Sequence, residues 1–221
     1  MNNINYSLSS HIALHEKKRS LYRYICGLLA GIMCIIIISS NMSITVSADD
    51  YPKAPDIESG NCILMDADSG IVLYEKNSGE KCYPASVTKL MTALIVAESC
   101  NLGDTLTVSR NAVSSVKYGD AAAGLKTGEE FTVEQALNVM LIKSANDMAY
   151  ALGEYAGGSI ANFANMMNKK AEELGCLNTH FTNASGLTDL NHYTTAYDMA
   201  LICRAVLGYP AIMNAISYTK S

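Results

Sequence analysis

The segment from Ser86 to Ala97 constrains the fold of this chain more than any other. Residues Leu90 to Ala97 are apolar apart from Thr92 and carry no charge, which predicts a helix that is buried over most of its surface. Ser86 and Lys89 stand three residues apart at its start, and residues i and i+3 share one face of an α-helix. The sequence therefore predicts that a hydroxyl and an amine meet over the first turn of a rigidly held helix.

This pair has the composition of an activated nucleophile. The first turn carries the positive end of the helix dipole, which favours loss of the Lys89 proton and an incipient alkoxide on Ser86. A serine needs such activation before it can attack a carbonyl. The Ser-x-x-Lys spacing recurs at Ser78, Ser114 and Ser217, but only Ser86 begins a helix apolar enough to be buried. The alternative is a capping serine followed by a surface lysine.

A second polar cluster lies between two predicted helices, where Ser144 and Asn146 stand two residues apart. In a tight connection, both side chains can point into one cleft. The hydroxyl can then relay a proton and the amide can hold a peptide carbonyl. The Ser-x-Asn triplet recurs at Ser59, Ser99 and Ser109, so a helix cap is the alternative for Ser144.

Charge is distributed unevenly along the chain. The net charge is −5, but residues 1–48 hold four basic residues against the single acidic Glu16, so the remainder carries −8. An acidic body argues against nucleic acid as a partner. The charge does not argue for or against a small peptide as substrate.

Residues 1–48 have the form of a targeting segment. Lys17–Arg23 is basic, Ile25–Ile38 is apolar and uncharged, and Val46–Ala48 has the small-residue form of a cleavage site. The apolar run is shorter than the ~20 residues of a spanning helix, so we expect a signal peptide, followed by a linker over residues 49–60. The alternative is a retained membrane anchor. Either form sends the acidic remainder across the membrane, with the basic residues left inside.

The cysteines and histidines give no sign of a metal centre. Seven cysteines are present, of which Cys26 and Cys34 fall in the targeting segment, and the others show no Cys-x-x-Cys spacing. The four histidines form no ligand pattern. We therefore expect no metal or cofactor, and buried free thiols, with one or two disulfides as the alternative.

Beyond the linker, the chain begins with strand patterns and continues with helical ones. The runs Cys62–Asp66 and Ile71–Glu75 flank a turn rich in Asp, Ser and Gly, which predicts a β-hairpin, and a short strand is expected over Thr105–Val108. Helices are predicted over Thr132–Leu141, Asp147–Tyr155, Asn162–Leu174 and Thr195–Leu207. The first of them begins with a capping-box pattern at Thr132 and Gln135. Residues 61–221 should thus form an α+β domain, with helices beside an antiparallel sheet. Two strands make a poor sheet alone, so we expect a sheet that is incomplete in this chain.

Several segments carry a resemblance to a known family. They are Tyr83–Ala93, Leu125–Gly158 with its Thr132–Leu137 and Ser144–Asp147, Phe181–Leu187, and Tyr193–Ala200. The first resembles the nucleophile segment of the serine-type D-Ala-D-Ala carboxypeptidases, which are the low-molecular-mass penicillin-binding proteins of peptidase family S11. The second resembles the segment that bears their second motif, and the last two together resemble a downstream stretch. The resemblance runs from about Ala54 to about Ile216.

The resemblance implies a β-lactamase/penicillin-binding-protein-like fold and a mechanism. Ser86 would attack the carbonyl between the two terminal D-alanines of a peptidoglycan stem peptide, with Lys89 as general base. Ser144 would pass a proton to the leaving D-alanine, and Asn146 would bind the peptide. The acyl-enzyme on Ser86 would then be hydrolysed, and β-lactams would trap the same serine. An exported enzyme at the outer face of the cell membrane or in the cell wall is implied.

One part of the family pattern does not match. The family's third motif, Lys-Thr-Gly, follows the second on a strand beside the nucleophile, whereas Lys126–Gly128 precedes Ser144. We expect this triplet to be a loop, the chain to represent the N-terminal part of a longer enzyme, and its hydrolysis to be impaired. Three alternatives stay open: a class A β-lactamase-like enzyme, a non-catalytic vestigial protein, and a transpeptidase. The first needs a Glu-x-x-Leu-Asn segment after the second motif, whereas Glu134–Asn138 has this form but precedes Ser144 within a predicted helix, where we expect Glu134 to face solvent.

Overall fold

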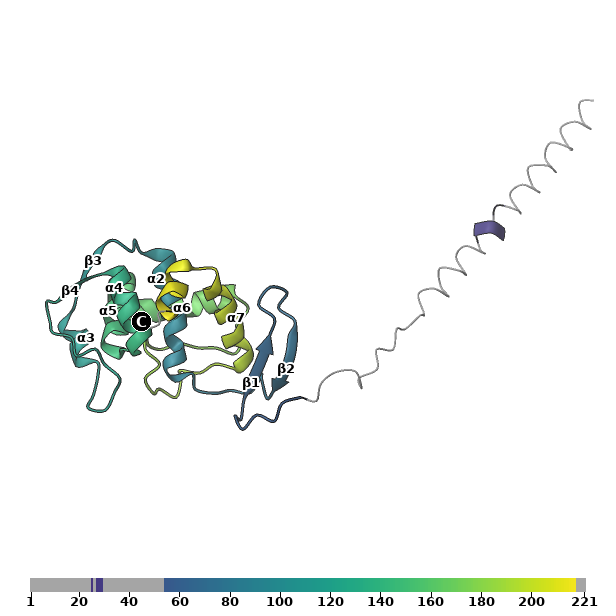
Figure 1. Ribbon diagram of the computed structural model, residues 1–221, viewed down its shortest axis with the longest axis horizontal. Coiled ribbons are helices and arrows are strands. Elements are labelled where there is room, and N and C mark those ends of the chain that lie inside the picture. Colours follow the sequence, from purple (N-terminus) through teal and green to yellow (C-terminus); the bar gives the residue numbers. More distant parts are fainter. Residues whose placement is uncertain (1–24, 26, 30–53, 218–221) are drawn as a thin grey trace, which may run out of the picture. The chain divides into compact units, whose positions relative to one another are not determined.

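The computed structural model describes Ile25, residues 27–29 and residues 54–217 of the chain (Figure 1). The chain divides into two compact units, residues 1–54 and 55–221, and the strands and helices named below belong to the second. In the first unit, Ile25 and residues 27–29 are helical. The rest of the predicted signal peptide and residues 49–53 lie outside the described residues, so the boundaries at 48 and 60 stay predictions.

The predicted hairpin is confirmed. Strands β1 (Cys62–Met65) and β2 (Val72–Lys76) pair antiparallel, and the Asp66 carboxylate closes the turn by accepting the backbone N–H of Ser69 at 2.8 Å. β1 packs against helix α7 (Ala196–Leu207), as Figure 1 shows at one end of the unit. Several apolar side chains of the hairpin stay exposed, among them Leu64 and Leu73 at 57% and 63%.

Helix α2 (Thr88–Ser99) is the centre of the core, as its composition predicts. Its buried residues are Thr88, Lys89, Met91, Thr92, Ala93, Leu94, Ile95 and Val96. The expectation that the α-helix begins at Ser86 is wrong, because Ser86 lies in a preceding 3-10 turn, η2 (Ala85–Val87). Ala85 has a positive φ of 46°, which is incompatible with a regular α-helical turn. A 3-10 turn has three residues per turn and eclipses residues i and i+3, so Ser86 and Lys89 still meet.

Five further helices build the helical part around α2. They are α4 (Val133–Lys143), α5 (Asn146–Gly157), α6 (Ile160–Glu173), α7 and α8 (Pro210–Ile216), and all of them pack against α2. The capping box of α4 is confirmed, with Thr132 accepting from the backbone N–H of Gln135 at 3.1 Å and the Gln135 side chain accepting in return. Helix α8, which sequence analysis missed, begins at Pro210, a residue favoured in the first turn. Among the described helices, none alone is long and apolar enough to span a membrane; α7 and α8 meet those criteria only together, across a bend of 106°.

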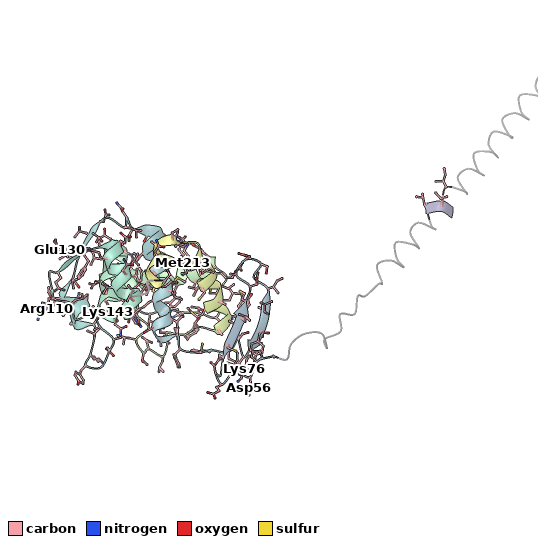
Figure 2. All side chains as sticks on the ribbon, in the orientation of Figure 1. Asp56, Lys76, Arg110, Glu130, Lys143 and Met213 are labelled. Carbon is pink, nitrogen blue, oxygen red and sulfur yellow. The ribbon has the colours of Figure 1, made fainter. Side chains whose placement is uncertain are left out.

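A second antiparallel pair lies at the opposite end of the unit from the hairpin (Figure 1). It joins β3 (Thr105–Thr107), as predicted, to β4 (Glu130–Thr132), which was not predicted, and the short helix α3 (Arg110–Ser114) lies beside it. Figure 2 shows the labelled side chains of Arg110 and Glu130 at this end and those of Asp56 and Lys76 at the hairpin end. The domain is therefore α+β, with two small sheets flanking a helical core.

Candidate active site

The predicted pair forms a direct contact. Lys89 Nζ lies 3.1 Å from Ser86 Oγ, and the two side chains differ sharply in environment. Ser86 is exposed, whereas Lys89 is 3% exposed. A hydroxyl that a ligand can reach therefore lies over an amine that water hardly reaches.

Two further oxygens surround the amine. Lys89 Nζ donates to Asn146 Oδ1 at 2.7 Å and to the backbone carbonyl of Ser185 at 2.9 Å. A neutral amine has two N–H bonds and one lone pair. Because both carbonyl oxygens are obligatory acceptors, they take the two N–H bonds and leave the lone pair directed at Ser86 Oγ. The geometry thus suits an uncharged Lys89 that accepts the Ser86 proton.

Burial supports this protonation state. It lowers the pKa of Lys89 to about 8 from its ordinary value of 10.5, since desolvation penalises the charged form. The three salt bridges within the described residues all involve Lys169 or Lys170, so no described carboxylate offsets the burial of Lys89. A substantial fraction of Lys89 is therefore neutral near pH 8.

Ser144 lies in the connection between α4 and α5, as predicted. It is the C-terminal cap of α4, with a left-handed φ of 53°, and it is half-buried. Within residues 54–217, its hydroxyl forms no hydrogen bond with another side chain or backbone group. The structure thus brings Lys89 into direct contact with both Ser86 and Asn146. Ser144 stands two residues before Asn146 in the chain, and its relay role stays a prediction.

Asp147 is a site residue that sequence analysis missed. Its buried carboxylate accepts the backbone N–H groups of residues 123–125 at 2.9, 2.9 and 3.2 Å, and that of Met148 at 2.9 Å. The Asn146 backbone N–H donates to the carbonyl of Ala121 in the same loop. Asp147 therefore fixes the start of α5 and, with it, the carboxamide that contacts Lys89. An acidic residue directly after the Ser144–Asn146 triplet was the available signal.

The second missed element is the segment of residues 181–192, here called the site loop. Besides the Ser185 carbonyl, it supplies the carbonyl of Ala184, which accepts from the Thr92 hydroxyl at 2.6 Å. Its shape depends on Asn183, whose Oδ1 accepts from the backbone N–H groups of Ser185 and Gly186 at 3.1 and 2.8 Å. This segment resembled the family in sequence but had no predicted role, because it contacts Lys89 and Thr92 through backbone carbonyl oxygens.

Gly186 makes the closest approach of the site loop to the nucleophile. It has a φ of +85°, and a Cβ atom added there would lie 1.8 Å from the carbonyl oxygen of Ala85. Only glycine fits both the backbone conformation and this contact. The residue before Ser86 is therefore held directly against the site loop.

Two other sequence candidates lie away from this cluster. Lys126–Gly128 forms a turn ahead of β4 in which the Gly128 backbone N–H donates to the carbonyl of Val108, as expected for a loop. Glu134, the residue of the β-lactamase alternative, is exposed on α4. Neither forms a described hydrogen bond with Ser86 or Lys89.

The cysteines are free among the described residues, with only Cys176 fully buried. The prediction of buried free thiols is therefore wrong for the other four, which are half-buried or, for Cys203, exposed.

Comparison with known proteins gives consistent matches over this domain. Residues 48–221 match the peptidase S11 family, described as D-alanyl-D-alanine carboxypeptidase. The D-alanyl-D-alanine carboxypeptidase DacF of Bacillus subtilis is 38% identical over 197 residues, which cover 86% of this chain and 49% of the relative. The chain spans about half the length of the curated relatives it matches.

Solved structures agree with the sequence matches. The D-alanyl-D-alanine carboxypeptidase DacD from Francisella tularensis has a TM-score of 0.71 at 32% identity, covering 80% of this chain and 44% of that one. Penicillin binding protein 6B from Escherichia coli has a TM-score of 0.68 at 33% identity, covering 71% of this chain and 52% of that one. The expected penicillin-binding-protein-like fold is thereby confirmed.

Proposed function

Because the chain belongs to the peptidase S11 family of D-alanyl-D-alanine carboxypeptidases, we propose that it supplies the nucleophile of a hydrolase that removes the terminal D-alanine from peptidoglycan stem peptides. The observation that carries this proposal is the environment of Lys89. Its amine contacts Ser86 Oγ at 3.1 Å while Asn146 Oδ1 and the Ser185 carbonyl take its other hydrogen bonds. Such an amine is a base directed at one hydroxyl.

The proposed reaction has two halves. In the first, Ser86 Oγ attacks the carbonyl carbon of the penultimate D-alanine while Lys89 Nζ takes the hydroxyl proton. The C–N bond then breaks, the proton passes through Ser144 to the leaving amine, and an ester forms on Ser86. In the second half, water attacks this ester, Lys89 accepts its proton and Ser86 Oγ is released protonated. The backbone N–H of Ser86 stabilises the oxyanion, and Asn146 binds the peptide.

β-Lactams are proposed to acylate the same hydroxyl. The likeness to penicillin binding protein 6B supports this inhibitor class, and the exposure of Ser86 over a buried amine suits covalent capture. The ester that a β-lactam forms with Ser86 would persist longer than on a class A β-lactamase, because no described acidic residue is hydrogen-bonded to Ser86 or Lys89 to activate a deacylating water.

Slow D-alanine release by the 221-residue chain on its own is a further part of the proposal. The only Lys-Thr-Gly triplet in the sequence, Lys126–Gly128, lies in a turn bonded to Val108, so it does not supply a cation for the substrate carboxylate beside Ser86. Release of D-alanine from a D-Ala-D-Ala peptide by this chain, over many turnovers, at the rate of a full-length D-alanyl-D-alanine carboxypeptidase such as DacF of Bacillus subtilis would contradict it.

Export is proposed from the pattern of residues 1–48, which would bring the domain to peptidoglycan at the outer face of the membrane or in the cell wall. Mass spectrometry of the protein isolated from cells tests this. A mature N-terminus near Asp49 is the expected result, an intact N-terminus on an exported chain indicates the membrane anchor, and retention inside the cell would contradict export.

Covalent labelling tests the enzymatic proposal. The chain is incubated with a fluorescent penicillin, digested, and the labelled peptide is sequenced by mass spectrometry. The label is expected on Ser86 and should vanish in Ser86→Ala. Ser114→Ala, in a second Ser-x-x-Lys tetrad of the same chain, is the matched control and should keep it. A label on another side chain, or none, would overturn the proposal, and rapid release of hydrolysed penicillin would favour the β-lactamase alternative.

A further inference from the structure

His192 is a buried residue that the proposed reaction does not use. It ends the site loop, is 2% exposed, and lies beside Thr88, the first residue of α2. Its Nε2 lies 2.8 Å from Thr88 Oγ1, and its Nδ1 lies 3.1 Å from the backbone nitrogen of Thr182. The edge of the ring meets Phe181, with centroids 5.5 Å apart. Both ring nitrogens thus have partners on different elements.

The partners of His192 define its tautomer. The backbone N–H of Thr182 can only donate, so Nδ1 is the acceptor and carries no proton. Burial holds the pKa of His192 at about 4, although Asp189 raises it and His180 lowers it further, so the ring is neutral at neutral pH. The single proton therefore lies on Nε2, which donates to Thr88 Oγ1.

This hydrogen-bonded bridge closes the site loop onto the nucleophile segment. The first half of the loop already makes three contacts with that segment. Gly186 packs against the Ala85 carbonyl, and the carbonyls of Ser185 and Ala184 accept hydrogen bonds from the side chains of Lys89 and Thr92. His192 lies at the other end of the loop. Its side chain adds the contact with Thr88 and accepts a hydrogen bond from the backbone N–H of Thr182, near the start of the loop. Both ends of the loop are thereby fixed relative to the first turn of α2.

We propose that His192 is a positioning residue for the Ser86–Lys89 pair. Its neutral imidazole joins Thr88 to the site loop and so keeps the Ser185 carbonyl against the Lys89 amine. When that carbonyl is held, the lone pair of Lys89 stays directed at Ser86 Oγ; when it is released, the amine turns away. This inference rests on the proposed function only because the proposed function assigns a reaction to the Ser86–Lys89 pair.

Acylation kinetics give the first test. With the fluorescent penicillin, His192→Ala should lower the acylation rate constant by about 10- to 100-fold, since displacing a reacting group by ~1 Å costs about that much. The concentration for half-maximal labelling should change less than about threefold, because His192 contacts neither the ligand nor Ser86. His192→Gln, whose amide N–H can reach Thr88, should recover most of the rate.

A matched control comes from His180, whose Nδ1 pairs with the Asn191 carbonyl at 2.7 Å and which forms no described hydrogen bond with α2. His180→Gln should label at the rate of the unchanged chain. Equal losses in the His180 and His192 variants would mean that any disturbance of this region slows labelling, and would overturn the inference.

Thr88→Val removes the other end of the bridge with little change of volume. It should slow labelling as His192→Ala does, and the double variant should be no slower than either single one, because each single change already breaks the same contact. Fully additive losses would contradict the inference. Thr88→Val and His192→Gln also provide the test if His192→Ala does not fold.

A thiol readout separates this inference from the proposed function. In a Ser86→Cys background, the Lys89 amine should favour the thiolate, so iodoacetamide modifies the introduced thiol readily near pH 7, as followed by peptide mapping. Adding His192→Ala should lower that rate several-fold, and His192→Gln should restore it. If penicillin never labels Ser86 but the thiol responds in this way, the proposed function fails and the positioning role stands. A thiol rate that is indifferent to His192→Ala overturns the positioning role.

Discussion

The nucleophile segment and the β1–β2 hairpin were both predicted from sequence, yet different kinds of contact hold them. In the segment from Ala85 to Thr92, the polar side chains of Thr88, Lys89 and Thr92 are all hydrogen-bonded, chiefly to the site loop about a hundred residues later. In the hairpin, β1 packs on α7 while Leu64 and Leu73 stay exposed. The nucleophile segment is thus held through its own polar side chains. The hairpin is held by strand pairing, by packing on α7 and by Arg204, whose guanidinium donates to the turn carbonyls of Ala67 and Asp68 at 2.9 and 3.2 Å.

The largest expected effect comes from the amine. Lys89→Met should lower the rate of Ser86 labelling by about 1,000-fold or more, since the hydroxyl loses its only base. Stopped-flow or gel-based labelling kinetics measure it. Lys117→Met, in the Ser114 tetrad, is the control and should leave the rate unchanged; equal losses in both variants would remove the distinction between the two tetrads.

A smaller loss is expected from the backbone contact. Gly186→Ala puts a Cβ atom 1.8 Å from the Ala85 carbonyl, so either the site loop or the nucleophile turn must shift, and labelling should slow by about 100-fold. Gly175→Ala is matched in having a positive φ, of 82°, with open space around the added Cβ. Gly175→Ala should lower the free energy of unfolding by about 1 kcal/mol without slowing labelling. Similar labelling rates for the two variants would contradict the role of the contact between Gly186 and Ala85.

The pH dependence should follow from the burial of Lys89. The neutral amine is the reactive form, and burial lowers its pKa to about 8, so the labelling rate should rise with pH and level off above about 8. Below that point the rate should fall about tenfold per pH unit. Labelling between pH 6 and 10 measures this profile; a rate that is flat below pH 8, or that rises only near 10.5, is the contrary result.

The smallest effects are expected in the hairpin. Leu73→Ser should change the free energy of unfolding by no more than about 0.5 kcal/mol, because its side chain is already 63% exposed. Leu94→Ala, in the buried face of α2, should cost about 2–5 kcal/mol. Urea unfolding of the chain measures both, and a large cost at Leu73 would show that the hairpin face is covered in solution.

Sequence patterns predicted the elements whose signals are local. The capping box at Thr132, the hairpin turn and the apolar run of α2 each appear in a few neighbouring residues, and the structure has all three. The start of α2 was predicted wrongly because Ala85 has a positive φ and lies against Gly186, which is far away in sequence, so no local pattern signals this turn.

The site was predictable only in part, for the same reason. Ser86, Lys89 and Asn146 were identified from spacing and resemblance, and Lys89 contacts both of the others. The Ser185 carbonyl and His192 were not identified, since a backbone oxygen leaves no signature in a sequence and a lone histidine has many roles. Asp147 was named only as a part of a helix start, because its four backbone partners come together through the fold.

Direct titration of Lys89 tests the central claim, which is that this amine is neutral at the pH where Ser86 reacts. The chain is labelled with 13C at the lysine Cε, and the Cε shifts are followed from pH 6 to 12, with Lys89→Met to assign the signal. One lysine is expected to titrate near pH 8, and its signal should be missing from the variant. If every lysine titrates near 10.5, Lys89 is charged when Ser86 reacts and does not serve as its base.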